Sequence, residues 1–299
     1  MTKVIISGGS GNVGKNLTTL LKKNGFEVGI LTRNPSKDNK NDYYWDPDKM
    51  EIDPKFLAGT DMIFHLAGAG VADKKWTSSY KKEILESRVN GTRLLVETLQ
   101  RHTHQVKSIV SASAVGIYGT HPEGLVKEQY PADSNFLAEV CVKWEDEAMA
   151  FSNLGINLSI IRIGIVLSKE GGFIKEIGNL AKYGLAAPLG SGKMMVPWIH
   201  VEDLCRMFLF LGQHPEYKGI YNGVAPHPET NAGLTKYIAK ALNRPMFLPP
   251  VPGFMLKLLM GEMGGMLLSD QNISSEKIQE VGFGFKYLHA EEAVREILG

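Results

Sequence analysis

The first half of the chain alternates short apolar runs with longer amphipathic segments. The runs are eight residues or fewer and rich in β-branched side chains, which favours strands. The segments between them repeat their apolar positions at helical spacing, which favours helices. Predicted strands lie at 4–6, 27–31, 62–66, 108–111 and 157–163, and predicted helices at 16–24, 79–101 and 135–151. This alternation predicts an α/β fold with a doubly wound parallel sheet.

Beyond residue 163 the alternation is looser. A returning strand is predicted at 219–222, and helices at 173–182, 201–211, 231–242, 274–280 and 290–298. The apolar segment 254–268 is too short to span a bilayer, so it is interpreted as a core or interface helix. We expect a Rossmann-type dinucleotide-binding domain at 1–165 and 197–224. A smaller C-terminal lobe at 166–196 and 225–299 is expected to cover the substrate.

A glycine-rich turn joins the first strand to the first helix. Gly8, Gly11 and Gly14 follow a G-x-x-G-x-x-G spacing, which permits a tight turn, close approach of a pyrophosphate and close helix packing. The helix behind the turn directs its N–H groups and dipole at the bound anion. The predicted cofactor contacts here are Gly8, Ser10, Gly11, Asn12, Val13 and Gly14. An ordinary strand-to-helix turn is the alternative.

The end of the second strand indicates which dinucleotide is bound. An acidic residue there would contact the ribose 2′-hydroxyl of NAD, but this chain has Thr32 and Arg33. A guanidinium can hold a 2′-phosphate with two parallel hydrogen bonds, which favours NADP(H). The alternative is a solvated loop arginine.

Composition narrows the class of partner. The 299 residues are 43% hydrophobic and carry 33 basic and 32 acidic side chains, for a net charge of +1. No broad field favours nucleic acid or a membrane surface, so a small molecule is the expected partner. Cys141 and Cys205 are interpreted as buried thiols, with no metal site expected. The first strand begins without a charged and apolar leader, so a cytoplasmic location is expected.

Two further stretches lie near the predicted cofactor edge. The small residues Leu66, Ala67 and Gly68 end the third strand and leave room for a flat cofactor. The helix 79–101 carries polar residues on one face. That face is interpreted either as a solvated surface or as part of the functional site. Those assigned to the cofactor site are Glu83, Arg88 and Asn90.

The fourth strand leads into a stretch from Ser111 to Gly119, where a family resemblance becomes clear. The pieces that carry it span most of the chain: the opening glycine motif, 66–68, 89–95, Ser113 with Tyr118 and Gly119, 161–164, and 198–204. The chain resembles the extended short-chain dehydrogenase/reductases. Its segments 72–77, 87–89, 136–139, 188–192 and 282–285 resemble an atypical epimerase-like subgroup. Bacterial members of that subgroup are often labelled nucleotide-sugar epimerases or cell-division inhibitors.

The resemblance implies a Tyr-x-x-x-Lys pair on the next helix, and the chain departs from it. The pair at that spacing is Glu139-x-x-x-Lys143, and the helix contains no tyrosine. Lys143 is expected to hold the nicotinamide ribose, whereas Glu139 is either a base or half of an ordinary helix ion pair. Ser113 and Tyr118 are candidates to bind a substrate oxygen, or are structural. Ser111 is assigned to the cofactor site.

The combined prediction is an NADP(H)-binding protein that works by hydride transfer on a hydroxyl or carbonyl. The resemblance implies a nucleotide sugar as substrate. The loop 184–198 is expected to cover it, with Met194, Met195 and Trp198 as an apolar wall. The missing tyrosine leaves a second hypothesis, a catalytically inactive NADPH-binding sensor or regulatory protein. No oligomeric state is predicted.

Overall fold

The computed structural model describes residues 1–121 and 124–299. Its centre is a sheet of eight strands in the order β12-β8-β6-β5-β1-β2-β3-β4. All neighbours in this sheet pair in parallel except β3 and β4. The strands are β1 (Lys3–Ser7), β2 (Glu27–Thr32), β3 (Asp42–Asp46), β4 (Glu51–Ile52), β5 (Thr60–His65), β6 (Ser108–Ala114), β8 (Asn157–Ile163) and β12 (Gly219–Gly223). The predicted doubly wound α/β fold is confirmed.

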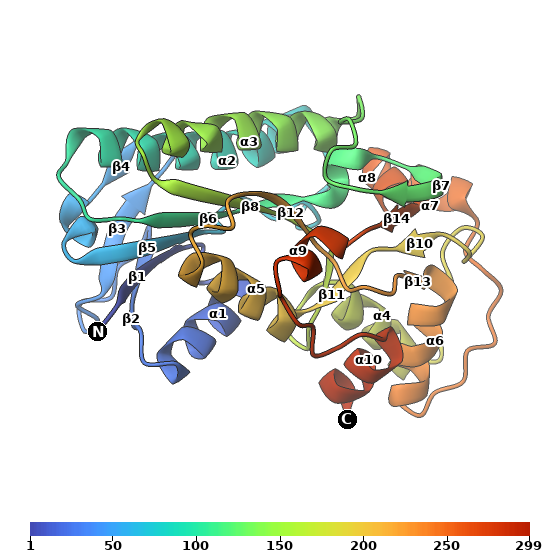
Figure 1. The fold of residues 1–299 in the computed structure, drawn as a ribbon. Coiled ribbons are helices and arrows are strands. Elements are labelled where there is room, and N and C mark those ends of the chain that lie inside the picture. The colour runs from blue at the N-terminus through green and yellow to red at the C-terminus, as the bar shows by residue number, and fades with distance from the viewer.

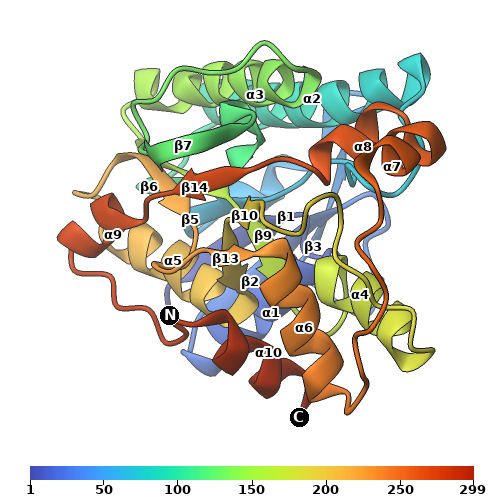
Figure 2. The ribbon, with the colours of Figure 1, turned by 90° about the vertical axis from the view of Figure 1, so that its right-hand side faces the viewer.

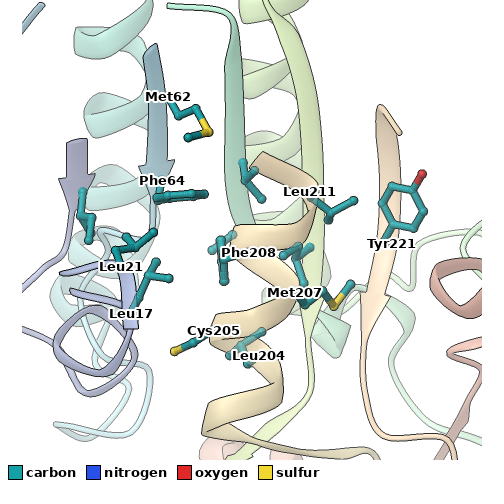
Figure 3. Close-up of a cluster of buried hydrophobic side chains, with 14 of the residues drawn as sticks. Leu17, Leu21, Met62, Phe64, Leu204, Cys205, Met207, Phe208, Leu211 and Tyr221 are labelled. Carbon is teal, nitrogen blue, oxygen red and sulfur yellow. The ribbon is translucent and has the colours of Figure 1, made fainter. Parts of the chain in front are cut away.

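Helices cover both faces of the sheet, as Figure 1 shows. α2 (Ser78–Arg101) and α3 (Phe136–Asn153) cover one face, and α1 (Asn12–Lys23) and α5 (Val201–Gln213) the other. Side chains alternate along β1, so Val4 and Ile6 pack toward α1 and α5 while Ile5 packs toward α2 and α3. Figure 3 shows Leu17 and Leu21 of α1 facing Phe208 of α5 across this core.

The second half of the chain builds a smaller body with a core of its own beside the sheet (Figure 2). Its helices are α4 (Gly172–Lys182), α6 (Asn231–Ala241) and α10 (Ala290–Leu298). Two short pairs accompany them, β9 (Ile165–Leu167) with β11 (Trp198–His200) and β10 (Met195–Val196) with β13 (Glu229–Thr230). The fully buried carboxylate of Asp203 accepts hydrogen bonds from the backbone N–H groups of Lys286 and Tyr287. This contact joins the chain's tail to α5.

The sequence interpretation missed several strands, among them β3, β4 and the paired strands β7 (His121–Val126) and β14 (Gln271–Ile273). The segment after Arg33, predicted as loop up to residue 61, contains β3, β4 and the 3-10 helix η1 (Pro54–Leu57). Polar residues flank β3 and hide its alternation, although its Trp45 is buried in the core. β7 pairs with β14, a contact between distant segments that no local pattern encodes. The side chains of residues 122–123 lie outside the described part.

The segment 254–268 is not a core helix. It forms two short helices, α7 (Gly253–Met260) and α8 (Glu262–Met266), which break at Gly261 with φ 62°. Leu258 is 82% exposed, so the interpretation of this segment as a core helix is wrong. The alternative, an interface helix, stays a prediction. The helix predicted at 274–280 is shorter, α9 (Glu276–Glu280). Among the described residues, no helix is long and apolar enough to span a membrane.

Candidate functional site

The glycine turn lies between β1 and α1, where the sheet's strand order reverses around β1. Ligands of doubly wound sheets bind in the crevice at such a switch point. Gly8 has φ 77°, and a Cβ on it would lie 3.0 Å from the backbone nitrogen of Ala67. A Cβ on Gly14 would lie 2.2 Å from the carbonyl oxygen of Gly8. The turn therefore packs its backbone closer to neighbouring backbone than any side chain would allow.

A buried histidine at the end of β5 contacts the end of β1, just before the glycine turn. The Nδ1 atom of His65 lies 2.6 Å from Ser7 Oγ, and its Nε2 atom lies 2.9 Å from Thr92 Oγ1. Because the Thr92 hydroxyl donates to the Arg88 carbonyl, its oxygen accepts from Nε2–H, and Ser7 donates to Nδ1. Burial lowers the pKa of His65 to about 4, so the ring is neutral at pH 7. Its role is to hold the strand ends, and Ser7 Oγ in turn accepts from the Ala67 N–H.

Other predicted cofactor residues surround the turn. Arg33 extends into solvent, with its side chain 69% exposed and 4.0 Å from the Asp48 carboxylate. Thr32 accepts a hydrogen bond from the Asn34 N–H. Asn12 donates to Ser168, which brings the loop before α4 onto the turn. Ser10 and Gly68 are exposed, and Val13 and Leu66 are partly buried, so these positions border open space beside the turn.

A cavity of about 590 Å³ opens at the carboxyl end of the sheet. Its walls come from the N-terminal parts of α2 and α3, the end of β8, the loop before β11, and α8. Gly164 lets the end of β8 pack closely against the loop before β11, because a Cβ at Gly164 would lie 2.3 Å from the Pro197 carbonyl oxygen. The volume is in the range of small-molecule sites.

Arg88 of α2 lines the cavity. Its Nη1 atom donates to the carbonyl oxygens of Ala69 and Ile84, and its guanidinium lies 5.1 Å from the Trp144 ring centre. Burial lowers the pKa of Arg88. No carboxylate among the described residues forms an ion pair with it. The guanidinium is therefore available to an anionic group of a ligand.

The other polar residues predicted on α2 lie differently. Glu83 is exposed and forms a salt bridge of 3.3 Å with Lys74. Asn90 is partly buried and does not line the cavity. The functional interpretation of this helix face is therefore supported by position for Arg88 alone.

The Glu139 and Lys143 pair lies on the outer face of α3. Their side chains are 55% and 50% exposed and form an ion pair of 2.6 Å. The cavity is lined from this helix by Phe136, Leu137, Val140, Cys141 and Trp144. At 100° per residue, Leu137, Cys141 and Trp144 lie at least about 100° around the helix from 139 and 143, and neither Glu139 nor Lys143 lines the cavity. The exposed ion pair favours the ordinary helix interpretation of these two residues. The base role of Glu139 and the ribose role of Lys143 stay predictions.

Ser113 and Tyr118 are held in a buried polar network. Ser113 donates to Glu145 over 2.6 Å, and Arg162 binds the same carboxylate with Nε and Nη2. The Tyr118 hydroxyl donates to Asn222 over 2.7 Å and accepts from Arg162 over 2.9 Å. Burial raises the pKa of Tyr118 to about 12. Neither side chain lines the cavity, so the structural interpretation of both residues is the one their surroundings support.

The covering loop and Ser111 also differ from expectation. Ser111 is fully buried within β6, with its hydroxyl donating to the Ala112 carbonyl. The loop 184–198 contributes Leu189, Val196 and Pro197 to the cavity, whereas Met194, Met195 and Trp198 do not line it. Backbone bonds from Gly190 to Val251 and from Ala232 to Gly192 hold this loop to neighbouring segments. It forms a packed wall.

Several cavity residues were not identified from the sequence. The chief ones are Cys141, Trp144, Asn231 and Gln271. Cys141 was interpreted only as a buried thiol, and burial raises its pKa to about 11. The signal that could have located Cys141 and Trp144 was the apolar face of α3, which continues from Leu137 through Val140. Gln271 reaches the site through the β7–β14 pairing, which has no local signature.

A glycine turn at the switch point of a doubly wound sheet, with a cavity at the carboxyl edge of the same sheet, defines a Rossmann-type dinucleotide-binding protein. The chain belongs to the NAD dependent epimerase/dehydratase family, which matches residues 4–222. A domain of unknown function matches residues 251–297. Among the described residues, no cluster of His, Cys, Asp or Glu could hold a metal ion.

Relatives with similar sequences cover nearly the whole chain. The epimerase family protein SDR39U1 homolog, chloroplastic, of Arabidopsis thaliana is 33% identical over 302 residues, covering 99% of this chain and 86% of that protein. An epimerase family protein of Staphylococcus aureus (strain MRSA252) is 32% identical over 300 residues, covering 100% and 99%. The chain is thus similar to plant and bacterial members of this family, and its predicted cytoplasmic location stays a prediction.

Solved structures extend the likeness to the fold. The human epimerase family protein SDR39U1 (isoform2), crystallised with NADPH, has a TM-score of 0.89 at 27% identity and covers 99% of each chain. The UDP-N-acetylglucosamine 4-epimerase of Bacillus cereus has a TM-score of 0.81 at 19% identity, covering 100% of this chain and 98% of that one. At that identity, the second likeness shows the fold alone.

Proposed function

We propose that this protein is an NADP(H)-dependent enzyme that acts by hydride transfer on a small molecule held in the cavity. The observation that carries the proposal is the cavity itself, at the carboxyl edge of the sheet, where the segment after β5 and the N-terminal half of α2 line it. A protein that only sensed the cofactor would need no room for a small molecule beside it. The human relative crystallised with NADPH supports the choice of cofactor.

The residues around the glycine turn fit a dinucleotide. The missing side chains of Gly8 and Gly14 let the backbone of the turn pack against Ala67 and against itself. This tight turn directs the backbone N–H groups at the start of α1 toward the pyrophosphate. Ser10, Gly11, Asn12 and Val13 complete this contact. They are joined by Leu66, Ala67 and Gly68 at the end of β5.

Arg33 and Arg88 supply the positive charge. Arg33 binds the 2′-phosphate with Thr32 beside it, because its guanidinium is exposed and only loosely paired. Arg88 meets an anionic or polar group inside the cavity. When bound, the reduced nicotinamide supplies a hydride. Cys141, a neutral thiol on the cavity wall, donates its S–H to the Ala114 carbonyl oxygen and so holds α3 against the end of β6.

Replacing Arg33 by alanine is expected to weaken NADPH binding by about 10- to 100-fold and leave NADH binding nearly unchanged. Hydrogen bonds to charged groups contribute about 1.5–3 kcal/mol, and NADH lacks the phosphate. Binding is measured by isothermal titration calorimetry. Arg101→Ala is the matched control, because Arg101 is also exposed but lies at the far end of α2. Equal losses for both cofactors would refute the 2′-phosphate assignment.

Turnover is tested by following nicotinamide absorbance with NADPH and a panel of aldehydes, ketones and nucleotide sugars. We expect oxidation of NADPH by at least one compound, with the Glu139→Gln variant as active as the wild type because Glu139 lies outside the cavity. Loss of activity in Glu139→Gln would restore the base role of this residue. Tight NADPH binding without turnover of any compound would favour the sensor hypothesis instead.

A further inference from the structure

The interior of the cavity is built mainly from carbon. Most of its lining side chains are aliphatic or aromatic, and many of them come from α2, α3, α4 and the strands β8 and β9. Representative members are Ile84, Val140, Trp144, Ile163, Ile165 and Phe173. A ligand that fills this space exchanges water for apolar contact, which stabilises carbon surface and disfavours unpaired hydroxyl groups.

The buried polar side chains of the lining are largely committed to the protein. Gln271 donates from Nε2 to the carbonyl oxygens of Val115 and Gly119. Asn231 accepts the Leu189 N–H on its Oδ1 atom. What remains is the second polar atom of each amide and the Trp144 indole N–H, which has no hydrogen-bond partner. These are few groups for the several hydroxyls of a sugar.

The charges of the lining also limit the ligand. Arg88 is the single Lys or Arg among the described lining residues. At the rim, Glu262 is paired with Lys81, and the exposed Asp133 carboxylate binds the Asn135 side chain and the Ser134 N–H. A pyrophosphate brings two negative charges, so it would face one partly buried cation and a rim carboxylate of its own sign.

We infer that the cavity binds an apolar carbonyl compound, or the corresponding alcohol, that carries no phosphate, and that it excludes nucleotide sugars. This inference rests on the proposed function for the presence of the cofactor, and it deepens that function by naming the substrate class. It departs from the nucleotide-sugar substrate that the family resemblance implies.

The test uses binding, so that it does not depend on turnover. Calorimetric titrations of the full-length protein, free and saturated with NADPH, are made with 1-acetonaphthone as the apolar ketone and UDP-glucose as the nucleotide sugar. We expect saturable binding of 1-acetonaphthone, at least about tenfold tighter than that of UDP-glucose. Tighter binding of UDP-glucose, or binding of neither compound, overturns the inference.

A pair of variants on α3 assigns the binding to this cavity. Leu137 lines the cavity and is partly buried, whereas Asp146 is exposed on the same helix and does not line it. Leu137→Gln should weaken 1-acetonaphthone binding by about tenfold, and Asp146→Asn should leave it unchanged. Circular dichroism checks that both variants fold. Equal affinity in both variants would place the ketone elsewhere and overturn the inference.

Failure of the proposed function gives a different result. In that case NADPH oxidation is absent for every carbonyl compound, while 1-acetonaphthone still binds and Leu137→Gln still weakens it. The substrate-class inference fails when the ketone does not bind in the cavity, whether or not NADPH binds at the glycine turn.

Discussion

Replacing Gly14 by alanine is expected to weaken NADPH binding by about a hundredfold, or about 2.8 kcal/mol. The added Cβ would lie 2.2 Å from the Gly8 carbonyl oxygen and 2.7 Å from the Gly9 Cα, both backbone atoms that cannot rotate away. The first turn of α1 must therefore move off the glycine turn. That movement displaces the N–H groups that are proposed to meet the pyrophosphate. Calorimetric titration with NADPH measures the loss.

The matched control is Gly284→Ala. Nothing lies within 4 Å of a Cβ at Gly284, and its backbone is not in the left-handed region. It should bind NADPH like the wild type. A thermal melt of both variants separates loss of binding from loss of folding, because the turn can shift while the sheet core stays packed. Wild-type affinity in Gly14→Ala would contradict the assignment of the turn to the pyrophosphate.

The sheet and its order of elements could be predicted because they are encoded locally. The apolar runs at β1 and β8 are bounded by polar residues, and the helices between them have clear apolar faces. β3 escaped prediction because its buried Trp45 is set among charged and polar neighbours. The β7–β14 pair escaped it because its stability comes from contact between segments about 150 residues apart, joined by Gln271 and His121.

The glycine turn could be predicted from local sequence, whereas the side chains that line the cavity could not. Glycines report a backbone requirement directly, so the tight turn at Gly8 and Gly14 could be predicted from their spacing. Their contact with a cofactor stays a proposal. The role of a polar side chain depends on which side of an element it occupies. The spacing of Glu139 and Lys143 matched a family pattern, but the apolar face that buries Val140 and Trp144 turns that pair toward solvent. The sequence could predict that Glu139 and Lys143 lie on a helix. The direction of their side chains depends on which face of that helix packs against the sheet.

Replacing Arg162 by methionine is expected to lower the free energy of unfolding by about 3–5 kcal/mol. Arg162 and Glu145 are 8% and 9% exposed, and the variant leaves the Glu145 carboxylate buried without its cation. It also removes a donor to the Tyr118 hydroxyl and to the Glu128 carbonyl. Urea unfolding measures the change. Arg93→Met is the control, because its partner Glu147 lies on a more exposed surface and the expected loss is about 1 kcal/mol or less.

The double variant Arg162→Met with Glu145→Met separates the two possible causes of that loss. If the cost comes from an uncompensated buried charge, removing the carboxylate should recover much of the stability of Arg162→Met. Ser113 then loses its acceptor, and Tyr118 loses the Arg162 donor while keeping its bond to Asn222. Both residues hold the stretch from Ala114 to Gly119, which forms one wall of the cavity. We therefore expect the double variant to bind 1-acetonaphthone less tightly than the wild type while remaining folded. Unchanged ketone affinity would show that the network stabilises the fold without shaping the cavity.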